Sequence, residues 1–185
     1  MDGVCDCCDG SDEGAAAQCP NTCAAMEAAA AQHRAEIEAG RRARDEYASR
    51  GSRTRDNHAT RTAPHAAYKA LDGQCFHSSE PGSEFTYEIC LYKSASQKEA
   101  RGHRRSVSLG STWSWQVPPH SSPSGADGDG VVGILSGGQM CVGAHVQRSL
   151  RLHFVCGAHG EHLSKVSESS TCVYEATLTT PAACT

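Results

Sequence analysis

Bulky apolar side chains are scarce in this sequence and unevenly placed along it. Leu, Ile, Val and Phe together number 24, and all but Val4 and Ile37 follow residue 70. From Leu71 to Cys184 these four types make up 22 of 114 residues, close to the roughly 20% below which folding becomes doubtful. Any hydrophobic core must therefore lie in the last two thirds of the chain, and it needs covalent support.

The eleven cysteines can supply that support. Small domains that bury too little apolar surface are commonly held by disulfides, which persist in oxidising compartments, so we predict a secretory-pathway protein. No apolar segment of a signal peptide follows Met1, and we therefore expect a truncated or misassigned N-terminus. No stretch approaches the about 20 apolar residues of a membrane span. A net charge of -4 gives no reason to expect nucleic acid as a partner.

Composition divides the chain into three regions. Residues 1–23 hold five cysteines among Asp and Gly, which suits a small module built of loops. Residues 24–65 predict an exposed Ala-rich spacer helix up to about residue 50, with Asn21 or Thr22 as N-cap and an interruption near Gly40, followed by a linker. From Leu71 onward, short alternating or β-branched segments predict an all-β sandwich or barrel with strands at 84–92, 104–110, 131–135, 148–156 and 172–178.

The first stretch, "CDCCDGSDE" at residues 5 to 13, combines thiols with carboxylates and suggests a metal site. Its cysteine spacing lacks the two separated pairs of a structural zinc site. An EF-hand loop beginning at Asp9 is excluded, because Pro20 takes the twelfth position, where a bidentate Glu is required. A disulfide knot with solvated acids and no ion is one interpretation, and a calcium site is the other. The acids available to calcium are Asp2, Asp6, Asp9, Asp12 and Glu13.

The string "DGVCDCCDGSDE" resembles the calcium-binding half of an LDL-receptor class A repeat, in the variant with a vicinal cysteine pair found in glucosidase II β subunits. The resemblance implies a partial repeat over residues 1–23 that holds one structural Ca2+. It implies as ligands the side chains of Asp2, Asp6, Asp12 and Glu13 and a backbone carbonyl near Val4. Such repeats begin upstream with another carbonyl ligand and another cysteine. Both are absent here, which again indicates a missing N-terminal piece.

Six cysteines remain for the β region, and an even number indicates three bridges. Their spacing alone leaves fifteen connectivities open. Each bridge could contribute about 3 to 4 kcal/mol by restricting the unfolded chain. The six are Cys75, Cys90, Cys141, Cys156, Cys172 and Cys184.

The sequence contains the strings "GQCF", "YEICLYKSASQ", "SLGSTWSW", "RSLRLHFVCG" and "ESSTCVYEATLTTPAAC". Their order and spacing resemble those of a mannose-6-phosphate receptor homology (MRH) domain, and here again the sequence is similar to glucosidase II β subunits. The resemblance covers residues 66–185 and implies a mainly β fold, a disulfide-bonded flattened β-barrel. It would follow the small calcium-binding cysteine-rich module and the Ala-rich helix. The implied bridges are Cys75 to Cys90, Cys141 to Cys172 and Cys156 to Cys184.

Members of this family bind a terminal mannose through a Gln, an Arg, a Glu and a Tyr. Carried onto the matching motifs, these are Gln97, Arg148, Glu168 and Tyr174. Planar amide, guanidinium and carboxylate groups can each engage two neighbouring sugar hydroxyls. Taken singly, each of the four could equally be an ordinary surface or strand residue. Arg151, three residues beyond Arg148, falls on the opposite face of the same strand and is assigned to solvent.

One motif departs from the family pattern. Where the family usually has Trp after the third cysteine, then Gly-Pro and the Arg, this sequence reads "CVGAHVQR", with Val142, no Pro and one extra residue. A missing Trp could remove on the order of 1 kcal/mol of contact with the sugar. We expect Trp113 and Trp115, which lie in another motif, to serve in packing rather than as replacements.

The chain contains none of the catalytic motifs for which we searched. "LSGGQ" at 135–139 resembles an ATPase signature, but no GxxxxGK[ST] motif accompanies it, and there is no HExxH or GxSxG. The resemblance implies a non-catalytic regulatory lectin subunit of glucosidase II in the endoplasmic reticulum (ER) lumen, binding high-mannose N-glycans beside the catalytic α subunit. The alternatives are an ER lectin of glycoprotein degradation or sorting, and a stand-alone hydrolase, for which we find no carboxylate pair. No HDEL-like retention signal precedes Thr185.

Overall fold

The structure is a computed structural model that describes residues 5–12, 17–79, 82–100, 106–117 and 130–185. The chain divides into two compact units, Met1–Ala39 and Gly40–Thr185. The helices are α1 (Cys23–Arg53), η2 (Thr60–Thr62), α2 (Ala66–Lys69) and η3 (Pro181–Ala183). The strands are β1 (Cys75–Ser79), β2 (Phe85–Cys90), β3 (Ser94–Glu99), β4 (Ser106–Gln116), β5 (Val132–Gly137), β6 (Met140–Cys141), β7 (Val146–Gln147), β8 (Ser149–Cys156), β9 (His162–Leu163), β10 (Ser167–Ser170) and β11 (Val173–Thr180).

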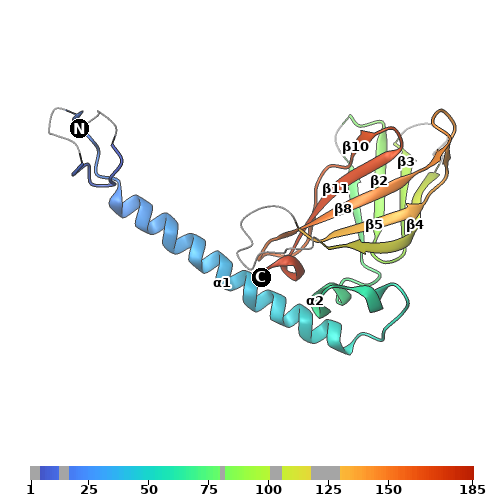
Figure 1. Cartoon of the computed structure of the whole chain (residues 1–185), viewed down its shortest axis with the longest axis horizontal. Helices are drawn as coiled ribbons and strands as arrows, with labels where there is room; N and C mark the ends of the chain where they lie inside the picture. Colours follow the sequence, from blue (N-terminus) through green and yellow to red (C-terminus); the bar gives the residue numbers. More distant parts are fainter. Residues whose placement is uncertain (1–4, 13–16, 80–81, 101–105, 118–129) are drawn as a thin grey trace. The chain divides into compact units, whose positions relative to one another are not determined.

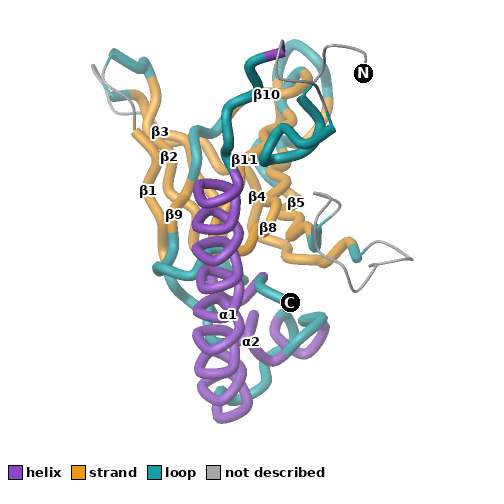
Figure 2. Tube along the Cα trace, turned by 90° about the vertical axis from the view of Figure 1, so that its left-hand side faces the viewer, coloured by secondary structure: helices purple, strands orange, loops and turns teal. Residues whose placement is uncertain are grey.

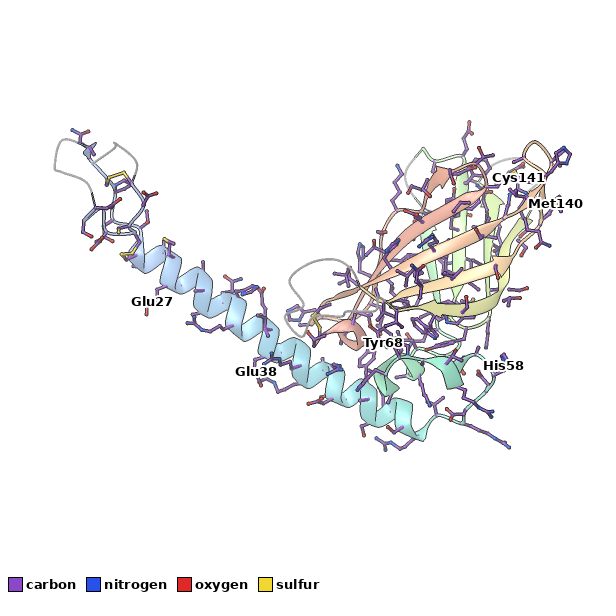
Figure 3. All side chains as sticks on the ribbon, viewed as in Figure 1. Glu27, Glu38, His58, Tyr68, Met140 and Cys141 are labelled. Atoms are coloured by element: carbon purple, nitrogen blue, oxygen red, sulfur yellow. A yellow bond between two sulfur atoms is a disulfide. The ribbon has the colours of Figure 1, made fainter. Side chains whose placement is uncertain are left out.

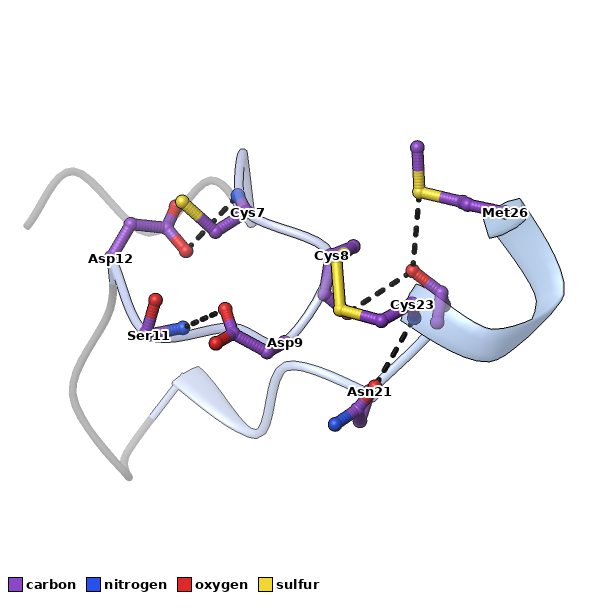
Figure 4. The surroundings of a disulfide bond; sticks show 9 residues. Cys7, Cys8, Asp9, Ser11, Asp12, Asn21, Cys23 and Met26 are labelled. Atoms are coloured by element: carbon purple, nitrogen blue, oxygen red, sulfur yellow. Dashed lines mark hydrogen bonds between the residues drawn. A yellow bond between two sulfur atoms is a disulfide. The ribbon is translucent and has the colours of Figure 1, made fainter. Parts of the chain in front are cut away.

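Two disulfides hold the first unit, Cys5–Cys19 and Cys8–Cys23. The second of these fastens the start of α1 to the cysteine-rich loop (Figure 4). The Asn21 side chain accepts a hydrogen bond from the Cys23 N–H at 3.1 Å, so it satisfies one of the free amides at the helix start. Cys7 is exposed and has no disulfide partner among the described residues.

Helix α1 is continuous from Cys23 to Arg53, so the predicted interruption near Gly40 is wrong. A Cβ on Gly40 would lie 2.8 Å from the Cys184 Sγ, and a Cβ on Gly51 would lie 1.8 Å from the carbonyl oxygen of Ala66. Both glycines are buried within the second unit. Because glycine has no side chain, the helix can come close to the rest of that unit at these two positions.

The prediction of an exposed spacer is wrong for the part of the chain that follows Gly40. Arg41 Nε donates a hydrogen bond to the Thr185 carbonyl at 3.1 Å, and the Tyr47 hydroxyl donates to the Glu161 carboxylate. Thr60, in the predicted linker, is completely buried. The exposed spacer therefore corresponds to only the first half of α1, where the side chains from Ala24 to Glu38 are exposed.

The β strands form one sheet in the order β1-β2-β3-β4-β5-β8-β11-β10, with β9 also paired to β11 (Figure 1). The neighbours are antiparallel except β8 and β11, which run parallel from Ser149↔Val173 to Cys156↔Thr180. β6 and β7 form a separate hairpin beside this sheet. The last strand of the described chain therefore lies inside the sheet rather than at its edge.

The sheet rolls into a nearly closed barrel. Tyr87 on β2 and Tyr174 on β11 are separated by four strands in the sheet, yet their ring centroids are 6.3 Å apart. β1 and β9 lie side by side where the two ends of the sheet meet (Figure 2). The interior is filled by fully buried aliphatic side chains, namely Leu71, Ile89, Leu91, Leu109, Leu135, Leu150, Leu152 and Leu178.

The prediction of a mainly β, disulfide-bonded barrel is confirmed. Each of the five predicted strand segments contains a strand, β2, β4, β5, β8 and β11, although residues 104 and 105 lie outside the described residues. The three bridges of the barrel join Cys75 to Cys90, Cys141 to Cys172 and Cys156 to Cys184. These are the same pairs that the family resemblance implied.

Candidate functional site

Three of the four predicted sugar-binding residues gather around Tyr87. Gln97 lies directly opposite Tyr87 in the β2–β3 pair, and its Nε2 donates a hydrogen bond to the Tyr87 hydroxyl at 3.2 Å. The Tyr87 ring also contacts Tyr174, and Glu168 lies directly opposite Tyr174 in the β10–β11 pair. Rolling of the sheet therefore brings β3, β10 and β11 to one region.

Burial distinguishes these side chains. Gln97 is 8% exposed and Tyr174 is 3% exposed, so both are largely enclosed by the barrel end. Glu168 is exposed, which leaves its carboxylate accessible to solvent. The pKa of the Tyr87 hydroxyl is raised, first by burial and then by the neighbouring Tyr174 and Glu168. Tyr87 therefore keeps its proton at neutral pH and can donate as well as accept a hydrogen bond.

Arg148 reaches the same end of the barrel through β6. Its Nη1 donates to the carbonyl oxygen of Met140 at 3.0 Å and to that of Gln139 at 3.4 Å. Its Nε is buried and has no hydrogen-bond partner among the described residues. The Gln139 N–H in turn donates to the carbonyl of Ser108 on β4. Ser108 directly follows Val107, the residue that pairs with Gln97. Two carbonyl groups therefore fix the guanidinium at Nη1, while its Nε–H donor has no partner among the described residues.

A hydrogen bond within its own turn fixes Glu168. The Oε1 of Glu168 accepts from the N–H of Cys172 at 2.6 Å, across the turn between β10 and β11. Cys172 has a φ of 64°, in the left-handed region that side chains other than glycine seldom adopt. The backbone of the turn therefore fixes the Glu168 carboxylate.

The departures from the family motif lie nearby. Val142 is 86% exposed in the turn between β6 and β7, so it covers no other part of the described structure. Trp113 and Trp115 belong instead to an aromatic cluster with Tyr92, which agrees with the expected packing role. Arg151 donates from Nη2 to the Gln116 side chain at 2.9 Å and takes no part in the candidate site.

Sequence reasoning missed Tyr87 as a site residue. The signal was present in "FTYEIC", where strand alternation puts Tyr87 on the same face as the core residue Ile89. A polar cavity of about 470 Å³ lies elsewhere, between β1 and the β9 region. None of the four predicted sugar-binding residues lines it. Its lining residues are Phe76, His77, Ser78, Ser79, Glu161, His162, Leu163 and Lys165.

The predicted calcium ligands are only partly described. Asp2, Val4 and Glu13 lie outside the described residues. One carboxylate oxygen of Asp12 accepts the N–H of Asp6 at 2.7 Å. The other accepts the N–H of Cys7 at 3.1 Å (Figure 4). Both donors lower the pKa of the Asp12 carboxyl, and the Asp6 amide has the larger effect.

The described part of the N-terminal module does not by itself fit a calcium site. Wherever the structure describes the chain, no group of three or more His, Cys, Asp and Glu side chains is arranged to hold a metal ion. The Asp12 carboxylate is directed into its own loop by the two amides. The calcium site therefore stays a prediction.

No helix in the described ranges is long and apolar enough to cross a membrane.

A family model described as glucosidase II beta subunit-like protein matches residues 33–185. Glucosidase 2 subunit beta of Mycosarcoma maydis is 31% identical over 125 residues, 68% of this chain and 20% of that protein. The same subunit of Oryza sativa subsp. indica is 37% identical over 111 residues, 60% of this chain and 15% of that protein.

Among solved structures, the MRH domain of glucosidase II beta bound to mannose is similar with a TM-score of 0.43 and 24% identity, over 64% of this chain and 100% of that one. The chain spans about a fifth or less of the length of the relatives named above. The family model, in contrast, covers most of the chain, from residue 33 to its last residue. On that match, this chain belongs to the glucosidase II beta subunit-like family.

Proposed function

We propose that residues 66–185 are a lectin domain that binds the terminal mannose of high-mannose N-glycans. The residues in contact with the sugar would be Gln97, Arg148, Glu168 and Tyr174. The observation that carries the proposal is the convergence of these positions. Gln97 and Tyr174 both adjoin Tyr87, and Arg148 and Glu168 are connected through the segment around Cys172.

The side chains have the chemistry that a sugar requires. A mannose ring presents neighbouring hydroxyls that both donate and accept hydrogen bonds. The buried Arg148 Nε lacks an acceptor among the described residues, and a sugar oxygen could supply one. The exposed Glu168 carboxylate can accept from two hydroxyls. A sugar with the wrong hydroxyl orientation would leave such groups unpaired, which supports selectivity.

At the level of the whole protein, we propose a non-catalytic regulatory subunit of glucosidase II that works in the ER lumen with a catalytic α subunit. Family membership supports this role, and both relatives named above are β subunits by name. The five disulfides of the described chain support an oxidising compartment. Bound mannose would keep the glycan near the α subunit and thereby promote glucose removal. Co-precipitation of the chain with an α subunit tests the partnership.

Mutation of the two charged residues tests the lectin proposal. We expect Glu168→Gln and Arg148→Ala each to weaken mannose binding about 10- to 100-fold, because hydrogen bonds to charged groups contribute about 1.5 to 3 kcal/mol. Isothermal titration with a high-mannose oligosaccharide measures the change. Arg151→Ala is the matched control, since this Arg contacts Gln116 away from the site. Undiminished binding by both site variants would refute the proposal.

A further inference from the structure

Cys172 makes three connections at the end of the barrel. Its N–H donates to the Glu168 carboxylate at 2.6 Å, and its carbonyl accepts from the Ser149 N–H at 3.2 Å. Its sulfur is bonded to Cys141. Ser149 directly follows Arg148, so Cys172 bonds one charged member of the proposed sugar site through its amide and the residue next to the other through its carbonyl.

The sulfur extends this connection to the guanidinium of Arg148. Cys141 follows Met140, whose carbonyl accepts a hydrogen bond from Arg148 Nη1 at 3.0 Å. The Arg148 N–H also donates to the Gln139 carbonyl at 3.2 Å, which keeps the backbone of Arg148 against the same segment. In Figure 3, Met140 and Cys141 lie at the end of the barrel opposite Tyr68. The bridge therefore fixes the carbonyl groups on which the guanidinium rests.

The backbone conformation of Cys172 is part of this arrangement. Its φ of 64° belongs to the left-handed region, which allows the turn between β10 and β11 to direct the Cys172 N–H back to Glu168, four residues earlier. Cys172 is 4% exposed and Cys141 is 6% exposed, so packing encloses the bridge. A disfavoured conformation of this kind persists where the surrounding structure enforces it, and such positions cluster at ligand sites.

The other two bridges of the barrel lie elsewhere. Cys75–Cys90 joins the paired strands β1 and β2. Cys156–Cys184 joins the far end of β8 to the chain end, beside Gly40. Within the described ranges, no hydrogen bond joins any of these four cysteines to a predicted sugar-binding residue. The three bridges are therefore not equivalent with respect to the site.

We infer that Cys172 is a positioning residue for the sugar site. Its N–H holds Glu168 directly, and it acts on Arg148 through the neighbouring Ser149 and through the bridge to Cys141, beside the Met140 carbonyl that the guanidinium contacts. The inference rests on the proposed lectin function. It assigns to Cys141–Cys172 a role in affinity beyond the stabilisation that any bridge supplies. The sugar would contact Glu168 and Arg148, and Cys172 would act through them.

The test compares the loss of two bridges. The variants are Cys141→Ser/Cys172→Ser and the control Cys156→Ser/Cys184→Ser. The paired cysteines are 31 and 28 residues apart, so the two bridges restrict the unfolded chain to a similar extent. We expect both variants to show a similar fall in Tm. At a temperature well below both Tm values, the first should bind high-mannose oligosaccharide at least tenfold more weakly, and the control within twofold of the unmodified chain.

A third variant, Cys141→Ser/Cys172→Gly, separates the backbone conformation from the covalent bond. Glycine adopts a positive φ readily, so the N–H can still point to Glu168 without the bridge. We expect it to bind more tightly than Cys141→Ser/Cys172→Ser, although glycine adds no contact. A purely structural role for the bridge would not produce this partial rescue.

A fourth variant covers the case in which the bridge variants fail to fold. One glycine inserted between Ser170 and Thr171 keeps all the cysteines but lengthens the turn, and we expect it to weaken binding at least tenfold. The inference is overturned if this insertion or the Cys141→Ser/Cys172→Ser variant binds like the unmodified chain, or if the control loses as much affinity. Absence of mannose binding by the unmodified chain overturns the proposed function itself, and this inference with it.

Discussion

At the scale of single residues, Tyr87 lies beside two of the predicted sugar-binding residues, Gln97 and Tyr174. Its hydroxyl accepts the hydrogen bond of the Gln97 amide, and its ring contacts Tyr174. Burial raises the pKa of this hydroxyl, so it stays protonated and retains a proton to donate. Tyr87 can therefore both orient Gln97 and offer a hydrogen bond to a bound sugar.

We expect Tyr87→Phe to weaken mannose binding about 2- to 10-fold, because one neutral hydrogen bond contributes about 0.5 to 1.5 kcal/mol and the ring packing is kept. Titration with a high-mannose oligosaccharide measures the effect. Thr86→Val is the matched control, since Thr86 is the neighbouring residue and contacts the Lys98 carbonyl instead. Equal affinities of Tyr87→Phe and the unmodified chain would show that the hydroxyl plays no part.

The same residues show what sequence could and could not provide. Gln97, Arg148, Glu168 and Tyr174 could be selected because each occupies a fixed position in a family motif. For Tyr87, strand alternation indicates only an inward-facing side chain, because its contact with Tyr174 spans 87 positions and exists only once the sheet has rolled. The role inferred for Cys172 was also out of reach, since it depends on a backbone angle that the sequence does not reveal.

At the scale of elements, strands with an apolar pattern on the buried face were predictable and strands of polar sequence were not. β11 alternates half-buried and buried side chains along its whole length, which its sequence "VYEATLTT" displays. β3 reads "SASQKE", and its inward face carries only Ala95 and Gln97, so it has no apolar pattern to detect. Its place in the sheet comes from pairing with β2 and β4 on either side.

Helix α1 was misjudged for a related reason. Gly40 was interpreted as an interruption and the helix was ended at about residue 50, although Gly40 and Gly51 lie at close contacts with the Cys156–Cys184 bridge and with Ala66. Glycine in a helix is unfavourable by about 1 kcal/mol relative to Ala when nothing approaches it. In α1 this intrinsic effect is outweighed by packing that only a bare backbone permits.

We expect Gly51→Ala to lower the free energy of unfolding by about 1 to 3 kcal/mol, because the added Cβ would lie 1.8 Å from the Ala66 carbonyl oxygen. Urea unfolding of the two proteins measures the difference. Gly143→Ala is the control, since a Cβ at Gly143 would meet nothing within 4 Å, and its change should stay within about 0.5 kcal/mol. If Gly51→Ala leaves the free energy of unfolding unchanged, the packing described for α1 is wrong.

At the scale of the whole molecule, the chain consists of two units with different means of support. The unit from Gly40 to Thr185 has both a buried aliphatic core and three bridges. In the first unit, no described residue of the cysteine-rich loop is buried, and two bridges hold the loop. The described part of the first unit therefore depends on its two bridges, and a bound ion would add to their effect.

Chelation tests the calcium prediction in the intact chain. We expect EDTA to speed limited proteolysis within residues 1–23, and added Ca2+ to reverse the effect, because a bound ion stabilises the folded form. Cleavage within Gly40–Thr185 serves as the internal control and should not change. Equal cleavage of residues 1–23 with and without EDTA would mean that the two bridges suffice and no ion is held.

The interior position of β11 has a consequence for biosynthesis. This strand is translated after its sheet neighbours β8, β9 and β10, yet it lies between β8 on one side and β10 and β9 on the other. Gln97 leaves the ribosome well before Tyr174, and at about 5 to 20 residues per second the delay between them is roughly 4 to 15 s. During that interval the sheet lacks β11, so the proposed sugar site can assemble only after this strand has been translated.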